Sequence, residues 1–247
     1  MSRLELINLE GLRVDGRRPN ELRKLNTSLG ILSEADGSAY LEIGNTKVLA
    51  TVYGPRDPRS RGLGLLEQAS LFVDITMSPF STNEHKKRAK NDKRMVEMAT
   101  AVRQTFEPVV LPHINTRSGI NIYLQILQHD GGLLQSCINV TTLALIHAGI
   151  PMTDYVVCTS LGLVDKTPIL DVNYTEETSG QTPDVTVAIT PTNGNVALLL
   201  VEDKLHTNDF KDLIELGVSG CHQIKSLLEE RVTKFTEDIT HKYQPNN

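Results

Sequence analysis

A β-hairpin pattern near the start of the chain limits the folds available to it. In DGSAYLEIGNTKVLATVYGP, from Asp36 to Pro55, apolar residues alternate with polar ones on both sides of the dipeptide Gly44-Asn45. Alternation with period two is typical of strands, and a two-residue turn of this composition joins neighbouring strands antiparallel. The chain is therefore predicted to begin its fold with an antiparallel pair of strands.

Further elements are predicted from the apolar spacing along the chain. Strands are expected in residues 69–80, 118–127, 155–164, 168–174, 184–191 and 195–203, with Asn193-Gly194 as a second hairpin turn. Helices are expected from Asp92 to about Val109, in 135–152, and over about 208–243 at the C-terminal end. Gly217 and Gly220 inside the last helix indicate a close backbone contact rather than a break.

Composition and organisation favour one globular α+β domain. The chain has 247 residues, 39% of them hydrophobic, and no Pro-, Gly- or Ser-rich linker divides it. After a short lead over residues 1–12, we expect a single domain over residues 1–247. The start of the chain has no apolar stretch long enough for a signal peptide or a membrane span, so a soluble protein without membrane contact is expected.

Charge and cysteine usage exclude some classes of protein. A formal net charge of -5 argues against a surface that binds nucleic acid everywhere, so any such contact must come from a local basic cluster. Cys137, Cys158 and Cys221 are odd in number and form no C-x-x-C, so neither a disulfide framework nor a zinc site is expected. No Walker loop, G-x-S-x-G or H-E-x-x-H motif is present either.

Two basic segments stand out in this acidic chain. The candidate RNA-binding residues are cations of STNEHKKRAKNDKR and of the loop GPRDPRSRGLG: Arg61, Lys86, Lys87, Arg88, Lys93 and Arg94. The simpler interpretation of such clusters is a solvated surface. Lys93 and Arg94, however, fall in the first turn of the predicted helix, where the helix dipole disfavours cations by about 0.3–1 kcal/mol. An anion bound there would remove that cost.

Glycines and carboxylates form the second group of candidates. Gly131 and Gly132 stand between a predicted strand and a predicted helix, where glycines often free backbone N–H groups for an anion, but Leu133 and Leu134 follow. Asp171, Glu176, Glu177 and Asp184 surround a later turn. Converging carboxylates can hold Mg²⁺ or act as a general acid, although acidic turns are common. Aromatic residues are only 4% of the chain, which favours contact with an RNA backbone over recognition of bases.

The chain resembles the RNase PH family. The matching stretches are GLRVDGRRPNELR, ADGSAYLEIGNTKVLATVYGPR, MSPFS, RQTFE, LQHDGG, HAGIPMTD and ILDVNYTEE, in order over nearly the whole chain. The resemblance implies an RNase PH-like α+β fold and, for active members, phosphorolytic 3'-to-5' removal of nucleotides. It also implies a phosphate loop that ends in Ser or Thr followed by Arg, a pair of aspartates, and a basic pair that opens a helix.

This sequence keeps only part of that site. Leu133 and Leu134 stand where the hydroxyl and the guanidinium are expected, and the first aspartate position holds Glu177 or Thr178. Asp184 matches the second aspartate, and Lys93 with Arg94 matches the basic pair. The resemblance therefore implies a vestigial active site at Gly131, Gly132, Leu133, Leu134, Glu177 and Asp184, with no catalytic residue, no metal and no cofactor.

The function implied is that of a non-catalytic subunit in the hexameric ring of the RNA exosome. Its partners would be single-stranded RNA, other RNase PH-like ring subunits, RNA-binding cap subunits and a separate nuclease, in the nucleus, nucleolus and cytoplasm. Arg61 would face the channel. Two alternatives stay open: an active phosphorolytic nuclease that binds phosphate through Arg88 or Arg103, and a scaffold without RNA contact.

Overall fold

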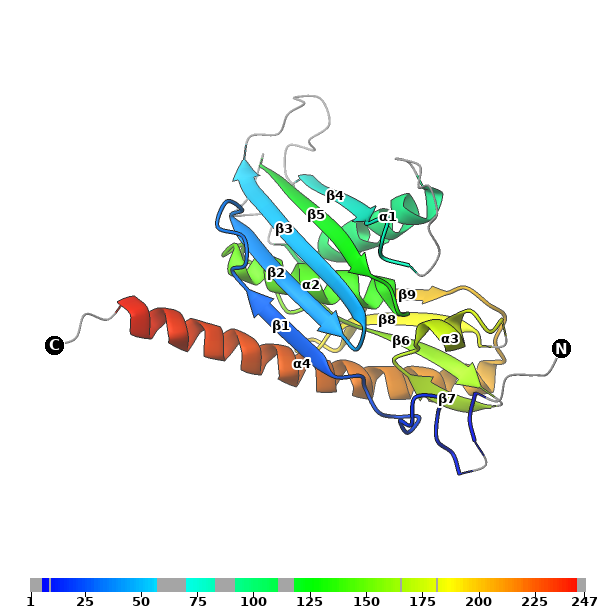
Figure 1. The fold of residues 1–247 in the computed structure, drawn as a ribbon. Helices are drawn as coiled ribbons and strands as arrows, with labels where there is room; N and C mark the ends of the chain where they lie inside the picture. The colour runs from blue at the N-terminus through cyan, green and yellow to red at the C-terminus, as the bar shows by residue number, and fades with distance from the viewer. Residues whose placement is uncertain are drawn as a thin grey trace.

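The described part of the molecule consists of two β-sheets and several helices, the longest of which lies at the C-terminal end (Figure 1). The computed structural model describes residues 6–8, 10–56, 70–82, 92–110, 118–164, 166–180 and 182–243. Within this part of the chain, no helix is long and apolar enough to span a membrane.

The first sheet has five strands and contains the predicted hairpin. Its strands are β1 (Leu25–Leu29), β2 (Gly37–Ile43), β3 (Thr46–Arg56), β4 (Ser70–Met77) and β5 (Gly119–Gln128), in the order β1-β2-β3-β5-β4. Ile43 pairs with Thr46 across the turn at Gly44-Asn45, which confirms the predicted hairpin. β4 is parallel to β5, whereas the other neighbouring strands are antiparallel. Strand β1 was not predicted, because its central residues Asn26, Thr27 and Ser28 are polar.

The second sheet has four antiparallel strands. They are β6 (Val157–Val164), β7 (Thr167–Leu170), β8 (Asp184–Thr190) and β9 (Asn195–Val201), in the order β7-β6-β8-β9. Thr190 pairs with Asn195, which confirms the second predicted hairpin.

One predicted strand is shorter than expected. The strand predicted over 168–174 ends at Leu170, because Asp171 has a left-handed backbone (φ 58°) and its carboxylate accepts hydrogen bonds from Arg23. A short helix follows, α3 (Tyr174–Glu177), with Asn173 and Glu176 as a capping box. The sequence contains the capping residues, but a four-residue helix has no periodicity that would reveal it.

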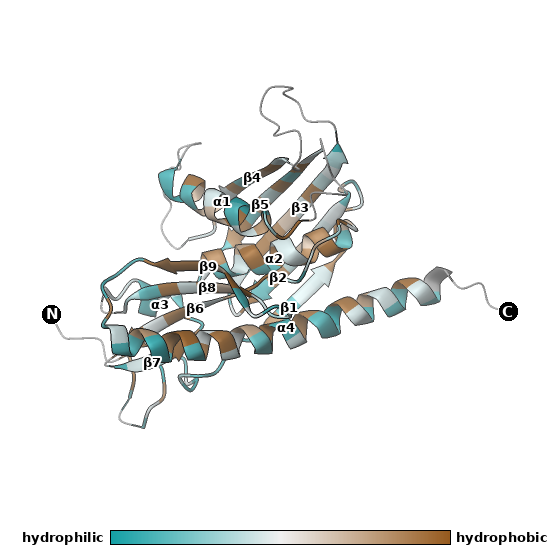
Figure 2. Ribbon diagram, turned by 180° about the vertical axis from the view of Figure 1, so that it is seen from behind, coloured by the Kyte–Doolittle hydropathy of each residue, from teal (hydrophilic) through white to brown (hydrophobic). Residues whose placement is uncertain are grey.

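Three longer helices complete the fold. They are α1 (Lys93–Phe106), α2 (Leu133–His147) and α4 (Thr207–Tyr243). Apolar and polar residues recur in bands along α4 (Figure 2), in agreement with the apolar spacing that predicted this helix. Gly217 and Gly220 permit its close approach to the sheet: a Cβ at these positions would lie 2.6 Å from Leu161 Cδ1 and 2.5 Å from Leu170 Cδ1.

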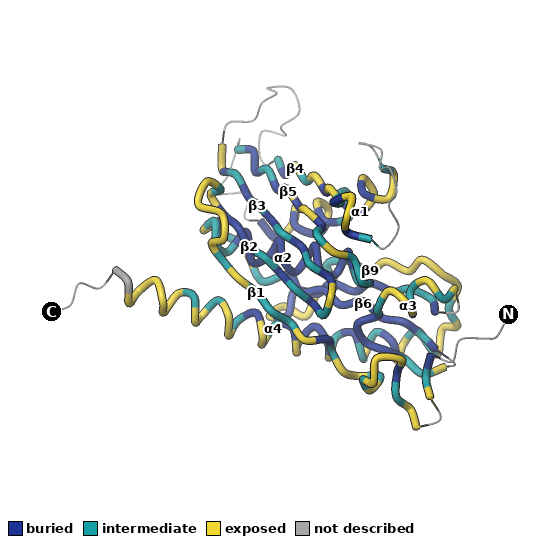
Figure 3. The backbone as a smooth tube through the Cα atoms, in the orientation of Figure 1, coloured by how far each residue is buried: buried dark blue, intermediate teal, exposed yellow. Residues whose placement is uncertain are grey.

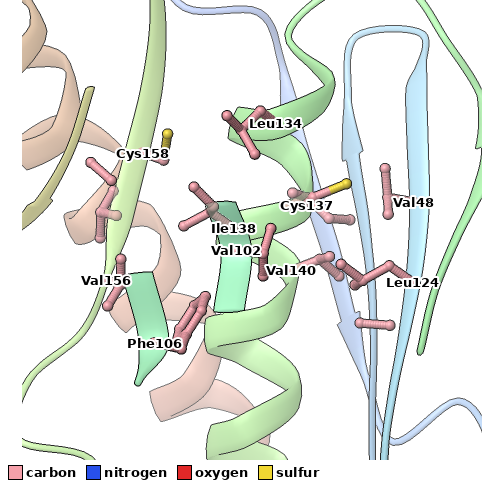
Figure 4. Close-up of a cluster of buried hydrophobic side chains, with 14 of the residues drawn as sticks. Val48, Val102, Phe106, Leu124, Leu134, Cys137, Ile138, Val140, Val156 and Cys158 are labelled. Carbon is pink, nitrogen blue, oxygen red and sulfur yellow. The ribbon is translucent and has the colours of Figure 1, made fainter. Parts of the chain in front are cut away.

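Helix α2 lies between the two sheets and organises the core. Its residues Leu133 to Leu145 are all buried, and it packs against β2, β3 and β6 (Figure 3). Figure 4 shows its side chains between α1, β6 and the first sheet: Leu134, Cys137, Ile138 and Val140 lie among Val102, Phe106, Val156, Cys158, Val48 and Leu124. Residues of both sheets thus share one continuous hydrophobic cluster.

Candidate functional site

A cavity of about 290 Å³ lies where α1, the start of α2, β8 and β9 meet. The described residues that line it are Arg94, Glu97, Met98, Ala101, Gly132, Leu133, Leu134, Ser160, Glu177, Asp184, Thr186, Leu200 and Glu202. Tertiary structure therefore brings together Arg94, the start of α2, Glu177 and Asp184, which the sequence singled out in three separate segments.

The wall formed by the start of α2 is aliphatic. Gly132 is the N-cap residue and has a left-handed backbone (φ 61°). Leu133 and Leu134 are therefore the first two residues of α2, whereas the sequence pattern predicted them in the loop before the helix. They are only 5% and 8% exposed. A helix N-terminus favours anions through its free N–H groups and dipole, but here no side chain adds a hydroxyl or a positive charge.

The carboxyl group of Asp184 has a raised pKa. Burial raises its pKa, and repulsion by Glu177 and Glu202 raises it further, whereas Arg94 lowers it; the result is a pKa of about 7. Its Oδ1 is buried and has no hydrogen-bond partner among the described residues. Asp184 therefore holds a proton over much of the range in which an ordinary aspartate is ionised.

Arg94 is engaged by a carboxylate of the protein itself. Its Nη2 donates to Glu177 Oε1 at 3.0 Å, and Glu177 is the last residue of α3. Asp92 caps α1 by accepting from the Arg94 backbone N–H. The anion expected near the start of α1 is thus partly supplied by Glu177. Lys93 is exposed and does not line the cavity.

Buried ion pairs that the sequence did not single out support the loop before α2. Arg23 donates to both carboxylate oxygens of Asp171, at 2.9 and 2.7 Å, and to the carbonyl of Asp130. Burial alone would raise the pKa of Asp171, but Arg23 and Arg17 outweigh it, so the pKa lies below its ordinary value. Asp171 was considered for a metal or acid role, but the structure pairs it with Arg23 and Arg17. The repeated arginines in GLRVDGRRPNELR were the signal for this pairing.

A second buried pair fixes the turn that ends in Glu177. Arg13 donates from Nε to Glu176 Oε1 at 2.8 Å, and the side chains are 0% and 1% exposed. Gly131 packs against the same turn: at φ 82°, a Cβ would lie 2.6 Å from the Val172 carbonyl oxygen. A glycine is therefore required at this position for packing, whether or not an anion binds.

The remaining candidates are not among the described residues that line this cavity. Arg61, Lys86, Lys87 and Arg88 lie outside the described residues. Arg103, the alternative phosphate ligand, lines a different groove, between α1 and β4.

The residues present do not fit a metal site. No group of three or more His, Cys, Asp or Glu side chains in the described ranges is arranged to hold a metal ion. Four carboxylates were considered for this role. Asp171 is paired with Arg23, Glu176 with Arg13 and Glu177 with Arg94. Asp184 favours its protonated form up to about pH 7.

Comparison with known proteins identifies the family. The models of the 3' exoribonuclease family match the chain with domain 1 over residues 21–151 and domain 2 over residues 154–220. The human exosome complex component RRP41 is 41% identical over 241 residues, which cover 97% of this chain and 98% of that protein. The Saccharomyces cerevisiae exosome complex component SKI6 is 40% identical over 239 residues, 96% of each chain.

Solved structures agree with the sequence comparison. The crystal structure of rice Rrp46 superposes with a TM-score of 0.76 at 28% identity, covering 88% of this chain and 98% of that one. The RNase PH-like α+β fold expected from the sequence is therefore confirmed. Together, the two domain models and the near full-length similarity establish that this protein belongs to the RNase PH (3' exoribonuclease) family, as an RRP41-type member.

Proposed function

We propose that this chain is a non-catalytic ring subunit of an RNA exosome, which supports 3'-to-5' RNA processing and degradation by a separate nuclease. The proposal includes heteromeric contacts with other RNase PH-like subunits and cap proteins, passage of single-stranded RNA through the ring, and work in the nucleus, nucleolus and cytoplasm. The names of the RRP41 and SKI6 relatives support the assignment to an exosome.

The observation that supports a non-catalytic role is the pair of buried leucines at the start of α2. Loss of a guanidinium removes a charge-assisted contact of about 1.5–3 kcal/mol with the attacking phosphate. The charge of the cavity adds to this loss, because the described lining contains three glutamates, Glu97, Glu177 and Glu202, but a single guanidinium, Arg94. Inorganic phosphate is therefore disfavoured by both the apolar wall and the acidic lining.

One observation favours a catalytic alternative. A carboxyl group with a pKa of about 7 is suited to act as a general acid at neutral pH, and Asp184 has such a pKa. In a phosphorolytic reaction it could protonate the leaving oxygen. The bound phosphate is nevertheless the nucleophile, so an acid alone does not restore the reaction.

A phosphorolysis assay separates these functions. The purified chain, alone and reconstituted with its ring partners, is incubated with single-stranded RNA and inorganic phosphate, with an active RNase PH enzyme as the positive control. We expect no nucleoside diphosphates. Their phosphate-dependent release, abolished by Asp184→Asn, would establish the catalytic alternative.

Crosslinking tests the contact with RNA. In the assembled ring, Lys93→Glu with Arg94→Glu, and separately Arg61→Glu, should weaken crosslinks to photoreactive RNA. Lys211→Glu on α4 is the matched control, because this exposed lysine lies far along the chain from the basic segments. Unchanged crosslinks in both test variants would favour a scaffold without RNA contact.

A further inference from the structure

Aromatic side chains gather on the open face of the five-stranded sheet. The chain has only 5 Phe and 6 Tyr and no Trp. Tyr53 of β3, Phe72 of β4 and Tyr123 of β5 nevertheless lie on one face. In Figure 1 this sheet stands in front of α1 and α2, which cover its opposite face. None of the helices in the described ranges covers the aromatic face.

The three rings are in contact. The ring centroids of Tyr53 and Tyr123 are 5.9 Å apart, and those of Phe72 and Tyr123 are 6.3 Å apart, both in edge-to-face geometry. The Arg56 guanidinium lies over the Tyr53 ring at 5.4 Å from its centroid. Phe72 is 54% exposed and Tyr123 is 38% exposed, so large apolar rings remain in contact with water.

The strand register adds an amide between two of the rings. Asn121 of β5 is the cross-strand partner of both Tyr53 and Phe72, and its side chain is partly exposed. Neighbouring side chains on one face of a sheet stand about 5 Å apart. A planar group lying on the rings would therefore come within reach of an amide that can donate and accept hydrogen bonds.

The surface is nearly neutral. Arg56 pairs with Asp36 at 3.0 Å, and Asp74 is the cross-strand partner of Tyr123. Strong attraction for phosphate is not expected from such a surface. Exposed rings, one guanidinium stacked on a ring, and an amide are instead suited to uncharged, planar groups with polar edges, which is the chemistry of nucleic-acid bases.

We propose that Tyr53, Arg56, Phe72, Asn121 and Tyr123, together the aromatic platform, stack bases of single-stranded RNA. This inference rests on the proposed function, which brings RNA to the subunit, and adds a second contact to it. The basic residues attract the backbone, whereas the platform binds bases without strong sequence preference, because every base has a stackable face.

The two contacts differ in their dependence on salt. Phosphate contacts release counterions, so removing them lowers the slope of log affinity against log salt concentration. Stacking releases few ions. Removing rings from the platform should therefore lower affinity at all salt concentrations and leave the slope unchanged.

The test uses the assembled ring and a fluorescein-labelled 12-nucleotide oligouridylate, with affinity measured by anisotropy at several salt concentrations. The double variant Phe72→Leu with Tyr123→Leu removes the ring faces but keeps apolar side chains. We expect its affinity to fall about five-fold or more, since stacking contributes about 1–3 kcal/mol per base. Phe72→Tyr with Tyr123→Phe keeps both rings and should bind like the wild type.

Phe80→Leu is the matched control, because Phe80 is 74% exposed and lies outside the platform. Thermal unfolding and gel filtration confirm that each variant folds and assembles. Affinity within two-fold of wild type in the double leucine variant would overturn the inference but leave the proposed function intact. Loss of ring assembly in that variant would instead identify the face as a protein contact and also overturn it. A wild-type ring that does not bind the RNA would contradict both proposals.

Discussion

At the residue scale, the chemistry of the cavity depends on which charges remain next to Asp184. Glu177 and Glu202 repel its carboxylate, and Arg94 is already paired with Glu177. The proton bound to Asp184 therefore relieves a repulsion that no described cation fully balances.

Asp184→Asn should stabilise the protein above neutral pH. Between the ordinary pKa of 3.8 and about 7, the folded state holds a proton that the unfolded state releases. The wild type therefore loses stability as pH rises through this window, by about 1.4 kcal/mol per pH unit at most. The Asp184→Asn variant should not lose stability in this way, because the asparagine side chain does not ionise. In thermal unfolding from pH 5 to pH 8, the Tm of the variant should exceed that of the wild type by a difference that grows with pH.

The exposed Asp212→Asn is the control for this comparison. It should shift Tm little at any pH. A constant difference between wild type and Asp184→Asn across the range would show that the carboxyl group is not perturbed.

A second prediction concerns the buried pair of Arg13 and Glu176. Arg13→Ala leaves the Glu176 carboxylate buried without its partner, so we expect a loss of about 3–5 kcal/mol in the free energy of unfolding. Arg18→Ala removes an arginine from an exposed pair with Glu21 and should cost less than about 1 kcal/mol. Urea denaturation measures both. Equal losses of stability in Arg13→Ala and Arg18→Ala would contradict the distinction between the buried and the exposed ion pair.

At the element scale, the position of α2 against the first sheet depends on a close backbone approach. Gly37 opens β2 beside the end of α2, and a Cβ there would lie 2.4 Å from the Ala144 carbonyl oxygen and 2.6 Å from Ala148 Cβ. Two backbones meet at this point, so rotation of a side chain cannot relieve the contact.

Gly37→Ala is therefore expected to cost about 3 kcal/mol or more, because β2 and α2 must separate. Gly180→Ala provides the comparison: Gly180 has a left-handed backbone (φ 66°) but open space around it, so only about 1–2 kcal/mol is expected. Denaturant unfolding of both variants tests the order. A smaller loss of stability in Gly37→Ala than in Gly180→Ala would show that α2 moves away from β2 at little cost.

Elements were predictable from the sequence where their periodicity was long. The hairpin, α1, α2 and α4 have enough residues for a pattern, and all were predicted. Strand β1 and helix α3 have too few residues for a pattern. β1 is held by pairing with β2, and Glu176 of α3 is held by Arg13, which is distant in sequence. Short elements are defined by such tertiary contacts rather than by local spacing.

At the scale of the whole molecule, strand β9 leaves an apolar edge. Among the described strands it pairs only with β8, and Val196, Leu199, Leu200 and Val201 are exposed. Figure 2 shows this strand as strongly apolar. No charged residue or proline interrupts Asn195–Val201, although such residues commonly protect sheet edges.

The isolated chain should therefore self-associate, and a charge on this edge should reduce the association. Val196→Lys is expected to shift the population toward monomer in sedimentation velocity at several concentrations, without lowering Tm. Val14→Lys, at an exposed position outside both sheets, is the control. A wild-type chain that is monomeric at high concentration would contradict the prediction.

The order of the long elements, the family and the absence of a phosphate-binding hydroxyl and guanidinium at Leu133 and Leu134 follow from the amino-acid sequence. Local periodicity and residue chemistry are sufficient for these. Three further features depend on the folded structure: Glu177 pairs with Arg94, the pKa of Asp184 is raised to about 7, and three aromatic side chains meet on one face of a sheet. Contacts between segments far apart in the chain depend on packing, because electrostatic and ring interactions act over a few ångströms that the linear order does not specify.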